Sequence, residues 1–442
     1  MKVKRCKSLS PEPSSSTNTK RAKRDEDDVE SGRSIKPSLL HLSDDVLLMI
    51  IKSLDPFDVM SLSKCCHRLD QVTQDRTLWS VMDYRSKSMS MVELEKYIKF
   101  FQPSVKTFAI RGNSEAKRYS EFTKHFLTTI MKNCTQLKEL LIEDYYINGT
   151  EIQILDLPSS LEKLSLKGCD LLQMELKQSY FFGVHEHMPH LTSLILSNCK
   201  WFAPHSLMVI SKLPKLKELR LDSCHRIGEC FAYTSLAARY GFKALQILDL
   251  RNTMIGDSEI ACFNCTETLT HLYLEYPSNI RSAQRNINSD RESEPNYPEE
   301  ERPMGRPRIF IQVHEDRNEA QVEVVHAENY NWHDMERYLV TDRTVCSLGN
   351  HVYERRIVDN SRENLPMFRI EEDTRVCNNP NLRILVVRNY RQVTDRSLHH
   401  LAVSKSNLEY VDVTGTSVTR EGVQMFKTQK PDVEIVSSFD CL

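Results

Sequence analysis

Two clusters of metal-binding side chains are the first places in this chain to search for chemistry. Cys262 and Cys265 form a Cys-x-x-Cys pair with His271 six residues later, and His185 and His187 are separated by one residue. A structural zinc needs four ligands, usually from two close pairs. Neither cluster has a second pair at a suitable spacing, so we expect no metal site and no cofactor.

Nucleophilic catalysis is the other chemistry that cysteines support. Among the 13 cysteines, Cys65 and Cys66 lie in an apolar helical stretch, where a thiol packs rather than reacts. The sequence contains no nucleophile elbow, phosphate-binding loop, kinase signature or zinc-protease helix. The paired Cys/His pattern of a RING domain is absent as well. We therefore expect no catalytic residue and a chain that is not an enzyme.

Several cysteines instead belong to a spacing that recurs, Leu-x-x-Leu-x-Leu-x-x-Cys. Three copies cover residues 161–169, 191–199 and 216–224. Related copies start at Leu137, Leu245, Leu269, Leu382 and Leu408, with a weak first copy at Val105. Apart from the gap between Leu269 and Leu382, clear copies start 24 to 30 residues apart, which suits one strand and one helix per repeat. The pattern predicts an α/β leucine-rich repeat solenoid with its leucines and cysteines packed inside.

In such a solenoid, parallel strands line the concave surface and helices cover the convex surface. Side chains between the leucines point to the concave surface, because strand residues alternate between two faces. Tyr and Arg tend to anchor protein contacts. The candidate substrate-binding residues on this surface are Arg220, Asp249, Arg251, Tyr273, Arg388, Tyr410 and Asp412. The mixed charge suits recognition of a protein, and the alternative is a merely solvated face.

Residues 36–85 predict three short helices ahead of the repeats. In the first helix, apolar residues recur at helical spacing after Ser43, which can cap the helix before Asp44 and Asp45. Asp55 and the proline that follows it end this helix, and two shorter apolar sets come next. A segment of this size buries little core by itself. We expect it to dock on a partner or on the neighbouring repeats.

This helical segment resembles the F-box motif over residues 42–47, 66–69 and 78–79. Ser43 stands where the family usually has proline, and the usual Trp or Phe near Leu69 is missing. Together with the repeats, the resemblance is to the F-box/LRR family, the substrate receptors of SCF-type E3 ubiquitin ligases. It implies that the F-box binds a Skp-type adaptor, and through it a cullin and a RING subunit, while the repeats hold an unknown target protein. The implied adaptor-binding residues are Leu42, Ser43, Val46, Leu47, Ile50, Leu54, Leu62 and Leu69.

The main alternative function is a nuclear protein-binding scaffold that uses the repeats without any ligase. An enzyme would need an active-site constellation, which the sequence lacks. The helical segment itself has a plainer interpretation as a cap that shields the first repeat. The identity of the target, its phosphorylation state and its fate after ubiquitination are not encoded in any motif of the chain.

Two segments lie outside the F-box and the repeats. Residues 1–35 combine serines, two basic clusters and an acidic run with few apolar residues, so we expect a disordered tail carrying a nuclear-import signal. Residues 281–381 separate the repeats of 86–280 from those of 382–442 and begin with an Arg/Glu/Pro-rich stretch. We expect a partly disordered insertion, either a partner-binding arm or a tolerated loop, in which one or two degenerate repeats are conceivable.

The overall composition indicates the cellular compartment of this chain and the classes of partner that it can bind. No stretch approaches the roughly 18 apolar residues that span a bilayer, and no secretory-type leader is visible. The formal net charge is −2, which argues against general nucleic-acid binding. We expect an intracellular protein with free thiols in the nucleus, and also in the cytoplasm, that binds neither nucleic acid nor membrane.

Overall fold

The structure is a computed structural model that describes residues 38–113, 121–173, 179–278, 308–314, 319–325, 339–349, 351–359, 368–404 and 407–439. A first compact unit ends at Leu47 and a second begins at Leu48. The expected N-terminal tail and its basic clusters lie outside the described residues. Disorder of that tail and nuclear import therefore stay predictions.

Short helices form the N-terminal part of the described chain. They are η1 (Leu39–His41), α1 (Asp44–Ile51), α2 (Pro56–Ser63) and α3 (His67–Thr73). Asp44 and Asp45 lie in the first turn of α1, where negative charge offsets the helix dipole. The Asp55 carboxylate caps α2 by accepting from the Phe57 N–H at 2.9 Å, with proline in the first turn.

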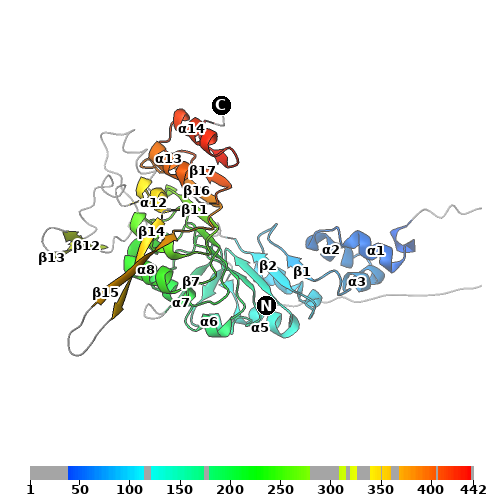
Figure 1. Cartoon of the computed structure of the whole chain (residues 1–442). Coiled ribbons are helices and arrows are strands. Elements are labelled where there is room, and N and C mark those ends of the chain that lie inside the picture. Colours follow the sequence, from blue (N-terminus) through cyan, green and yellow to red (C-terminus); the bar gives the residue numbers. More distant parts are fainter. Residues whose placement is uncertain are drawn as a thin grey trace, which may run out of the picture. The chain divides into compact units, whose positions relative to one another are not determined.

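An eleven-stranded parallel sheet forms the backbone of the second unit. Its strands, in spatial order, are β1 (Val81–Asp83), β2 (Thr107–Arg111), β4 (Glu139–Glu143), β6 (Lys163–Ser165), β8 (Ser193–Ile195), β9 (Glu218–Arg220), β10 (Ile247–Asp249), β11 (His271–Glu275), β16 (Ile384–Arg388), β17 (Tyr410–Asp412) and β18 (Glu434–Val436). β1 lies within the range that the sequence assigned to the F-box, and β18 extends the sheet beyond the last predicted repeat. Figure 1 follows these repeats along the chain from cyan to red.

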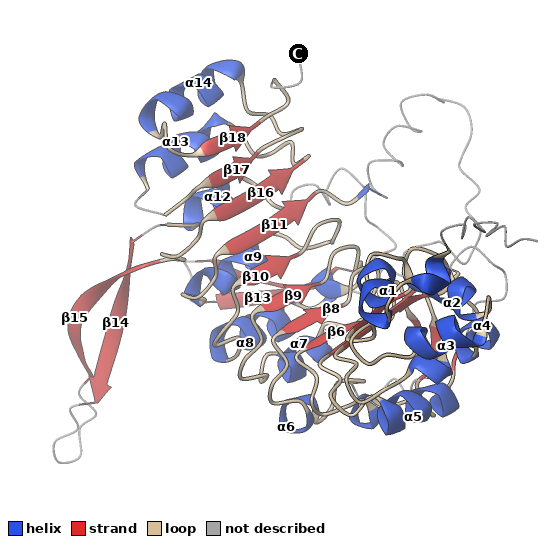
Figure 2. Cartoon of the chain, turned by 90° about the vertical axis from the view of Figure 1, so that its right-hand side faces the viewer, coloured by secondary structure: helices blue, strands red, loops and turns tan. Residues whose placement is uncertain are grey.

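Helices follow the strands in sequence and line one face of the sheet (Figure 2). They are α4 (Met91–Glu95), η2 (Ile98–Phe100), α5 (Lys124–Asn133), η3 (Ile154–Asp156), α6 (Val184–His187), α7 (His205–Ile210), η4 (Ile227–Glu229), α8 (Phe231–Tyr240), α9 (Asp257–Ala261), η5 (Cys262–Cys265), α12 (Asp342–Ser347), α13 (Asp395–Val403) and α14 (Arg420–Gln429). A small sheet of β3 (Glu121–Phe122), β5 (Tyr146–Asn148) and β7 (Asp170–Leu172) lies beside them in the first repeats. The predicted fold, helical F-box segment and then α/β leucine-rich repeats, is confirmed. The face of the large sheet away from the helices is called the open face below.

The repeated cysteines pack between repeats, as predicted. Each is buried, and its Sγ–H donates to a backbone carbonyl of the preceding repeat. These hydrogen bonds join Cys169 to Ile142 (3.2 Å), Cys199 to Leu166 (3.1 Å) and Cys224 to Leu196 (3.0 Å). Burial raises the pKa of the Cys169 and Cys224 thiols to about 12, so both stay protonated and unreactive at neutral pH.

A left-handed residue follows many of the strands and turns the chain toward the next helix. Gly168 takes this position after β6, with φ of +66°, and its N–H donates to the Ser197 carbonyl at 2.8 Å. A Cβ at Gly168 would lie 2.1 Å from an Asp144 carboxylate oxygen. Gly183 has a similar φ of +77°, but its nearest neighbour would be a Leu155 methyl at 3.5 Å.

Gly168→Ala is therefore expected to destabilise the protein by about 2–3 kcal/mol, from backbone strain together with displacement of Asp144. Gly183→Ala serves as the control that carries the strain alone, at about 1–2 kcal/mol. Urea unfolding measures both variants. Equal losses for the two would show that the Asp144 contact adds nothing. The double variant Gly168→Ala/Asp144→Gly should recover the difference, because Asp144 has a φ of +57° that glycine adopts without strain.

The insertion adds no strand to the large sheet within the described residues. β11 pairs directly with β16, with Tyr273 opposite Val386. The intervening chain forms two separate antiparallel hairpins, β12 (Arg308–His314) with β13 (Glu319–Val325), and β14 (His351–Asp359) with β15 (Phe368–Cys377). The described part of the insertion therefore contributes two hairpins and no strand of the large sheet.

One helix inside the predicted insertion belongs to the solenoid instead. α12 packs between α9 and α13 in the row of helices. The Asp257 carboxylate of α9 accepts from the N–H and hydroxyl of Thr341 at 2.8 and 2.7 Å. The Asp342 carboxylate of α12 accepts from Thr394 in the same way and at the same distances. Within the described residues, the predicted range 281–381 therefore contains one helix of the solenoid, α12, between the two hairpins in sequence.

Candidate docking surfaces

The first candidate surface is the outer face of helix α1. Val46 and Ile50, both predicted as adaptor-binding residues, are exposed, and so is Leu54 after the helix. Met49 is 73% exposed and shares this face, since positions three and four apart lie together on a helix. Sequence reasoning missed Met49, although the same helical periodicity would have placed it beside Ile50.

Other predicted adaptor-binding residues divide by exposure. Ser43 is exposed, whereas Leu42 and Leu62 are half-buried. Leu47 is 1% exposed and Leu69 is 4% exposed, so neither side chain is available to a partner. These two predictions are corrected to core positions. Helix α1 is apolar on both faces, and its hydrophobic pattern alone does not show which face is covered.

Helices α2 and α3 are held firmly against the first turns of the solenoid. The Trp79 ring stacks on Phe100 at 4.2 Å between centroids, and its indole N–H donates to the Thr73 carbonyl at 2.6 Å. The Lys99 ammonium donates to Asp70 at 2.8 Å and to Ser63 at 3.1 Å.

Phe57 strengthens this junction from α2. Its ring meets the rings of Tyr84 and Tyr97 edge-on, at 5.7 and 6.0 Å. Trp79, Phe100, Tyr84 and Tyr97 are buried, whereas the Lys99–Asp70 pair is partly exposed. The aromatic contacts therefore pack α2 and α3 against the first repeat.

The second candidate surface is the open face of the sheet, where strand register aligns one outward-facing residue from the middle of each repeat, called the middle column below. The aligned residues are Leu141, Ser165, Ile195, Arg220, Asp249, Tyr273, Val386 and Asp412. Each of these residues is paired in register with the next one in the series, on the adjacent strand. The order inferred from repeat spacing therefore agrees with the register of the sheet.

Four predicted substrate-binding residues come together on β9, β10 and β11. Arg251 binds Asp249 through two hydrogen bonds of 2.9 and 2.6 Å, and an Arg220 nitrogen lies 3.8 Å from the same carboxylate. The Arg251 guanidinium also lies over the Tyr273 ring at 5.5 Å, within cation–π range. Burial raises the pKa of Tyr273, while the nearby arginines act in the opposite direction.

The remaining three predicted residues form a second cluster on β16 and β17. The Arg388 Nε donates to Asp412 at 2.7 Å, and the Tyr410 hydroxyl lies 3.5 Å from the same oxygen. Burial raises the pKa of Asp412, but hydrogen bonds from Arg388 and Thr414 outweigh it and hold the pKa below its usual value.

Asp249 and Asp412 differ from the other predicted contact residues in that both are 0% exposed. A partner cannot touch them, and their predicted role in direct binding is corrected. Each carboxylate instead holds an arginine in one orientation on the open face. The sequence predicted that both acids lie on the open face. It did not predict their burial, because an arginine that binds each acid lies over it.

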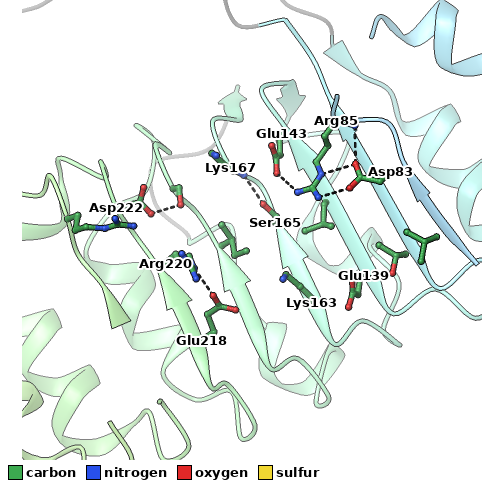
Figure 3. Close-up of a pocket in the computed structure, with 16 residues that line it drawn as sticks. Asp83, Arg85, Glu139, Glu143, Lys163, Ser165, Lys167, Glu218, Arg220 and Asp222 are labelled. Atoms are coloured by element: carbon green, nitrogen blue, oxygen red, sulfur yellow. Dashed lines mark hydrogen bonds and ion pairs between the residues drawn. The ribbon is translucent and has the colours of Figure 1, made fainter. Parts of the chain in front are cut away.

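A third feature is a groove of about 580 Å³ on the open face from β1 to β9, and of the predicted contact residues only Arg220 and Arg251 line it. Figure 3 shows its charged side chains rising from β1, β4, β6 and β9. Arg85 binds Asp83 through two hydrogen bonds of 2.9 and 2.6 Å and reaches Glu143 at 3.0 Å. Asp83-x-Arg85 repeats the spacing of Asp249-x-Arg251, which is a signal that could have indicated the groove.

Charges in the groove are mostly paired internally. Glu218 accepts from Ser193 at 2.7 Å and from Arg220 at 2.6 Å, and Asp222 accepts from Ser197 at 2.5 Å. Within the part of the chain that the structure describes, no ion pair involves the ammonium groups of Lys163 and Lys167, which also line the groove. The groove therefore presents alternating charges rather than one sign.

The clusters first considered for chemistry do not assemble into a metal site in the described part of the chain. No group of three His, Cys, Asp or Glu side chains there is arranged to hold an ion. The His187 ring contacts the Leu157 carbonyl at 2.7 Å, and the Cys262 thiol donates to the Ser258 carbonyl at 3.2 Å. Among the described helices, none is long and apolar enough to cross a membrane.

The fold and these surfaces define a helical docking module joined to a leucine-rich repeat scaffold. The family model of the F-box domain matches residues 39–80. F-box/LRR-repeat protein 12 of mouse and of human are each 23% identical to this chain over 226 residues, which is 50% of this chain and 67% of theirs. The bovine protein of the same name is 22% identical over 222 residues, 50% of this chain and 66% of its own.

Among solved structures, a leucine-rich repeat protein of Leptospira interrogans is 14% identical and covers 83% of this chain and 98% of its own, with a TM-score of 0.29. That superposition is too poor to support further argument. The F-box match and the similarity to F-box/LRR-repeat proteins support the resemblance to the F-box/LRR family that the sequence indicated.

Proposed function

We propose that this protein is the substrate-recognition subunit of an SCF-type E3 ubiquitin ligase. The observation that carries the proposal is an exposed apolar face, including Met49 and Ile50, within the residues that match the F-box. An apolar helix face of this kind suits burial against a partner protein. The partner proposed here is a Skp-type adaptor, which would bring a cullin and a RING subunit.

The proposed mechanism is positioning. The target protein binds the open face of the sheet, and the adaptor binds the F-box. Since Trp79, Phe57 and Lys99 hold α2 and α3 against the first repeat, a target on the first strands has little freedom relative to those helices. Proximity of this kind raises the rate of transfer without any catalytic group from this chain.

Reconstitution tests this function. The full chain is co-expressed with a Skp-type adaptor, a cullin and a RING subunit, and the purified assembly is supplied with ubiquitin, E1 and E2 enzymes. We expect a stable complex with the adaptor and ubiquitin chains on proteins that bind the repeats. A full chain that is folded, yet fails to bind the adaptor, would rule out the ligase function.

The alternative, a binding scaffold without a ligase, rests on the open face alone. It predicts that the bound proteins and their cellular amounts do not depend on the F-box. Under the proposed function, targets accumulate on a receptor whose F-box is disabled, because they are held and not handed on. Affinity capture with intact and disabled F-box therefore separates the two functions.

A further inference from the structure

A pair of arginines lies on the open face, Arg220 at the end of β9 and Arg251 two residues after β10. Asp249 lies between these two arginines. One of its carboxylate oxygens lies 2.6 Å from an Arg251 nitrogen and 3.8 Å from an Arg220 nitrogen. The two guanidinium nitrogens are therefore within about 6.4 Å of each other, the sum of those distances.

The guanidinium groups of Arg220 and Arg251 each retain N–H donors that can bind a partner. Arg251 uses its Nε and one terminal nitrogen on Asp249, and Arg220 uses its Nε on Glu218. An arginine has five N–H donors. Among the described residues, both terminal nitrogens of Arg220 and one of Arg251 donate no hydrogen bond, and the two side chains are 37% and 33% exposed.

The acids around the pair are already engaged. Asp249 is fully buried beneath the arginines, and Glu218 accepts from Ser193 as well as from Arg220. The formal charges of these two acids and two arginines cancel, and two further acids near Arg251, Asp222 and Glu275, accept hydrogen bonds from Ser197 and Asn389. Long-range attraction therefore contributes little to the binding of an incoming oxyanion. Recognition depends instead on the remaining guanidinium N–H groups of the two arginines, called the fork below, whose planar geometry matches carboxylate and phosphate oxygens.

A row of half-buried, mostly apolar side chains lies beside this fork. Strand register places Ile247, His271, Ile384 and Tyr410 next to one another along one edge of the open face. The Tyr273 ring, under Arg251, lies between this row and the fork. Apolar side chains of a partner can pack there while its acidic group reaches the arginines.

We propose that Arg220 and Arg251 bind an acidic side chain of the target protein, a carboxylate or a phosphorylated hydroxyl, with an adjoining apolar side chain packed on the row from Ile247 to Tyr410. This inference rests on the proposed role of the open face in target binding. Asp249 is a positioning residue in this site, since it orients Arg251 through two hydrogen bonds and is itself out of reach, whereas Arg220 is held by Glu218.

The test uses three peptide libraries with random flanks and a fixed central residue, which is phosphoserine, glutamate or serine. The purified full chain is the receptor, and retention is measured for each library. We expect the phosphoserine library, the glutamate library or both to be retained about tenfold or more above serine. Retention of phosphoserine alone would identify a phosphorylated target, and retention of both would identify a constitutively acidic one.

Variants assign that retention to the fork. Arg220→Lys keeps the charge but removes the planar fork, and it is expected to abolish the preference over serine, as is Arg220→Ala. Arg251→Lys gives a second, independent variant that leaves Asp249 a cationic partner. The matched control is Arg111→Ala, which removes an exposed arginine from β2 on the same face and should change nothing.

Equal retention of all three libraries, or full preference in a folded Arg220→Lys variant, would overturn the inference. Thermal unfolding of each variant shows whether it is folded. Adaptor binding is measured on the same preparations and depends on the F-box alone. A chain that binds the adaptor without preferring acidic peptides would refute this site and leave the ligase function standing.

Discussion

Ile50→Asp is expected to weaken binding of the Skp-type adaptor by at least about 100-fold, with little loss of stability. Ile50 is 39% exposed and lies in a short surface helix, so the substitution removes part of its packing and leaves the core residue Leu47 in place. In a complex, the aspartate would be buried without a partner, at a free-energy cost of about 3 kcal/mol or more. Surface plasmon resonance with the purified adaptor measures the affinity, and circular dichroism confirms the fold.

Two further variants sharpen this prediction. Met49→Asp lies on the same face and should act like Ile50→Asp. Lys52→Asp introduces the same aspartate at an exposed position directly after the helix and should retain binding. Leu47→Asp is unsuitable, because Leu47 is buried and the substitution would act through unfolding. Wild-type affinity of the Ile50→Asp variant would place the adaptor elsewhere.

Trp79→Ala is expected to lower the free energy of unfolding by about 3–5 kcal/mol, the range for deleting a large buried aromatic side chain. Trp79 is buried, stacks on Phe100 and donates its indole N–H to the Thr73 carbonyl. The substitution removes the stack and the hydrogen bond together, and it leaves a cavity where α3 meets η2. Urea unfolding followed by circular dichroism measures the loss.

Trp79→Phe separates the two contributions. Phenylalanine keeps much of the stacking on Phe100 and loses the N–H donor, so a smaller loss of about 1–3 kcal/mol is expected. In the reconstituted ligase, Trp79→Ala should also reduce ubiquitin transfer more than it reduces adaptor binding, because the helices no longer hold a fixed position on the repeat. Parallel losses of transfer and binding would contradict a positioning role for this junction.

Much of the open face was predictable because one repeat determines the others. The spacing of leucines fixed which residues alternate outward, and the middle column from Leu141 to Asp412 lies in the predicted register. The buried thiols of Cys169, Cys199 and Cys224 followed from the same spacing. Local periodicity is enough here, since each strand pairs only with its neighbours.

The burial of individual side chains and the contacts between residues far apart in the sequence were not predictable from this periodicity. Leu47 and Ile50 fit the same helical pattern, yet one is buried and the other exposed. The sequence pattern places α12 in the insertion and does not indicate that it is part of the solenoid. Its place between α9 and α13 depends on hydrogen bonds that Asp257 and Asp342 accept from threonines 84 and 52 residues away. No short window of sequence contains such a partner.

The sequence by itself determined the class of this protein, an F-box-like segment followed by leucine-rich repeats, because hydrophobic spacing is a local property of the chain. The tertiary structure decided which of the predicted contacts a partner can reach. Asp249 and Asp412 are polar residues on outward-facing positions, and only the arginines folded over them remove them from solvent. Exposure depends on what neighbouring strands place above a side chain, and that is a property of the folded sheet.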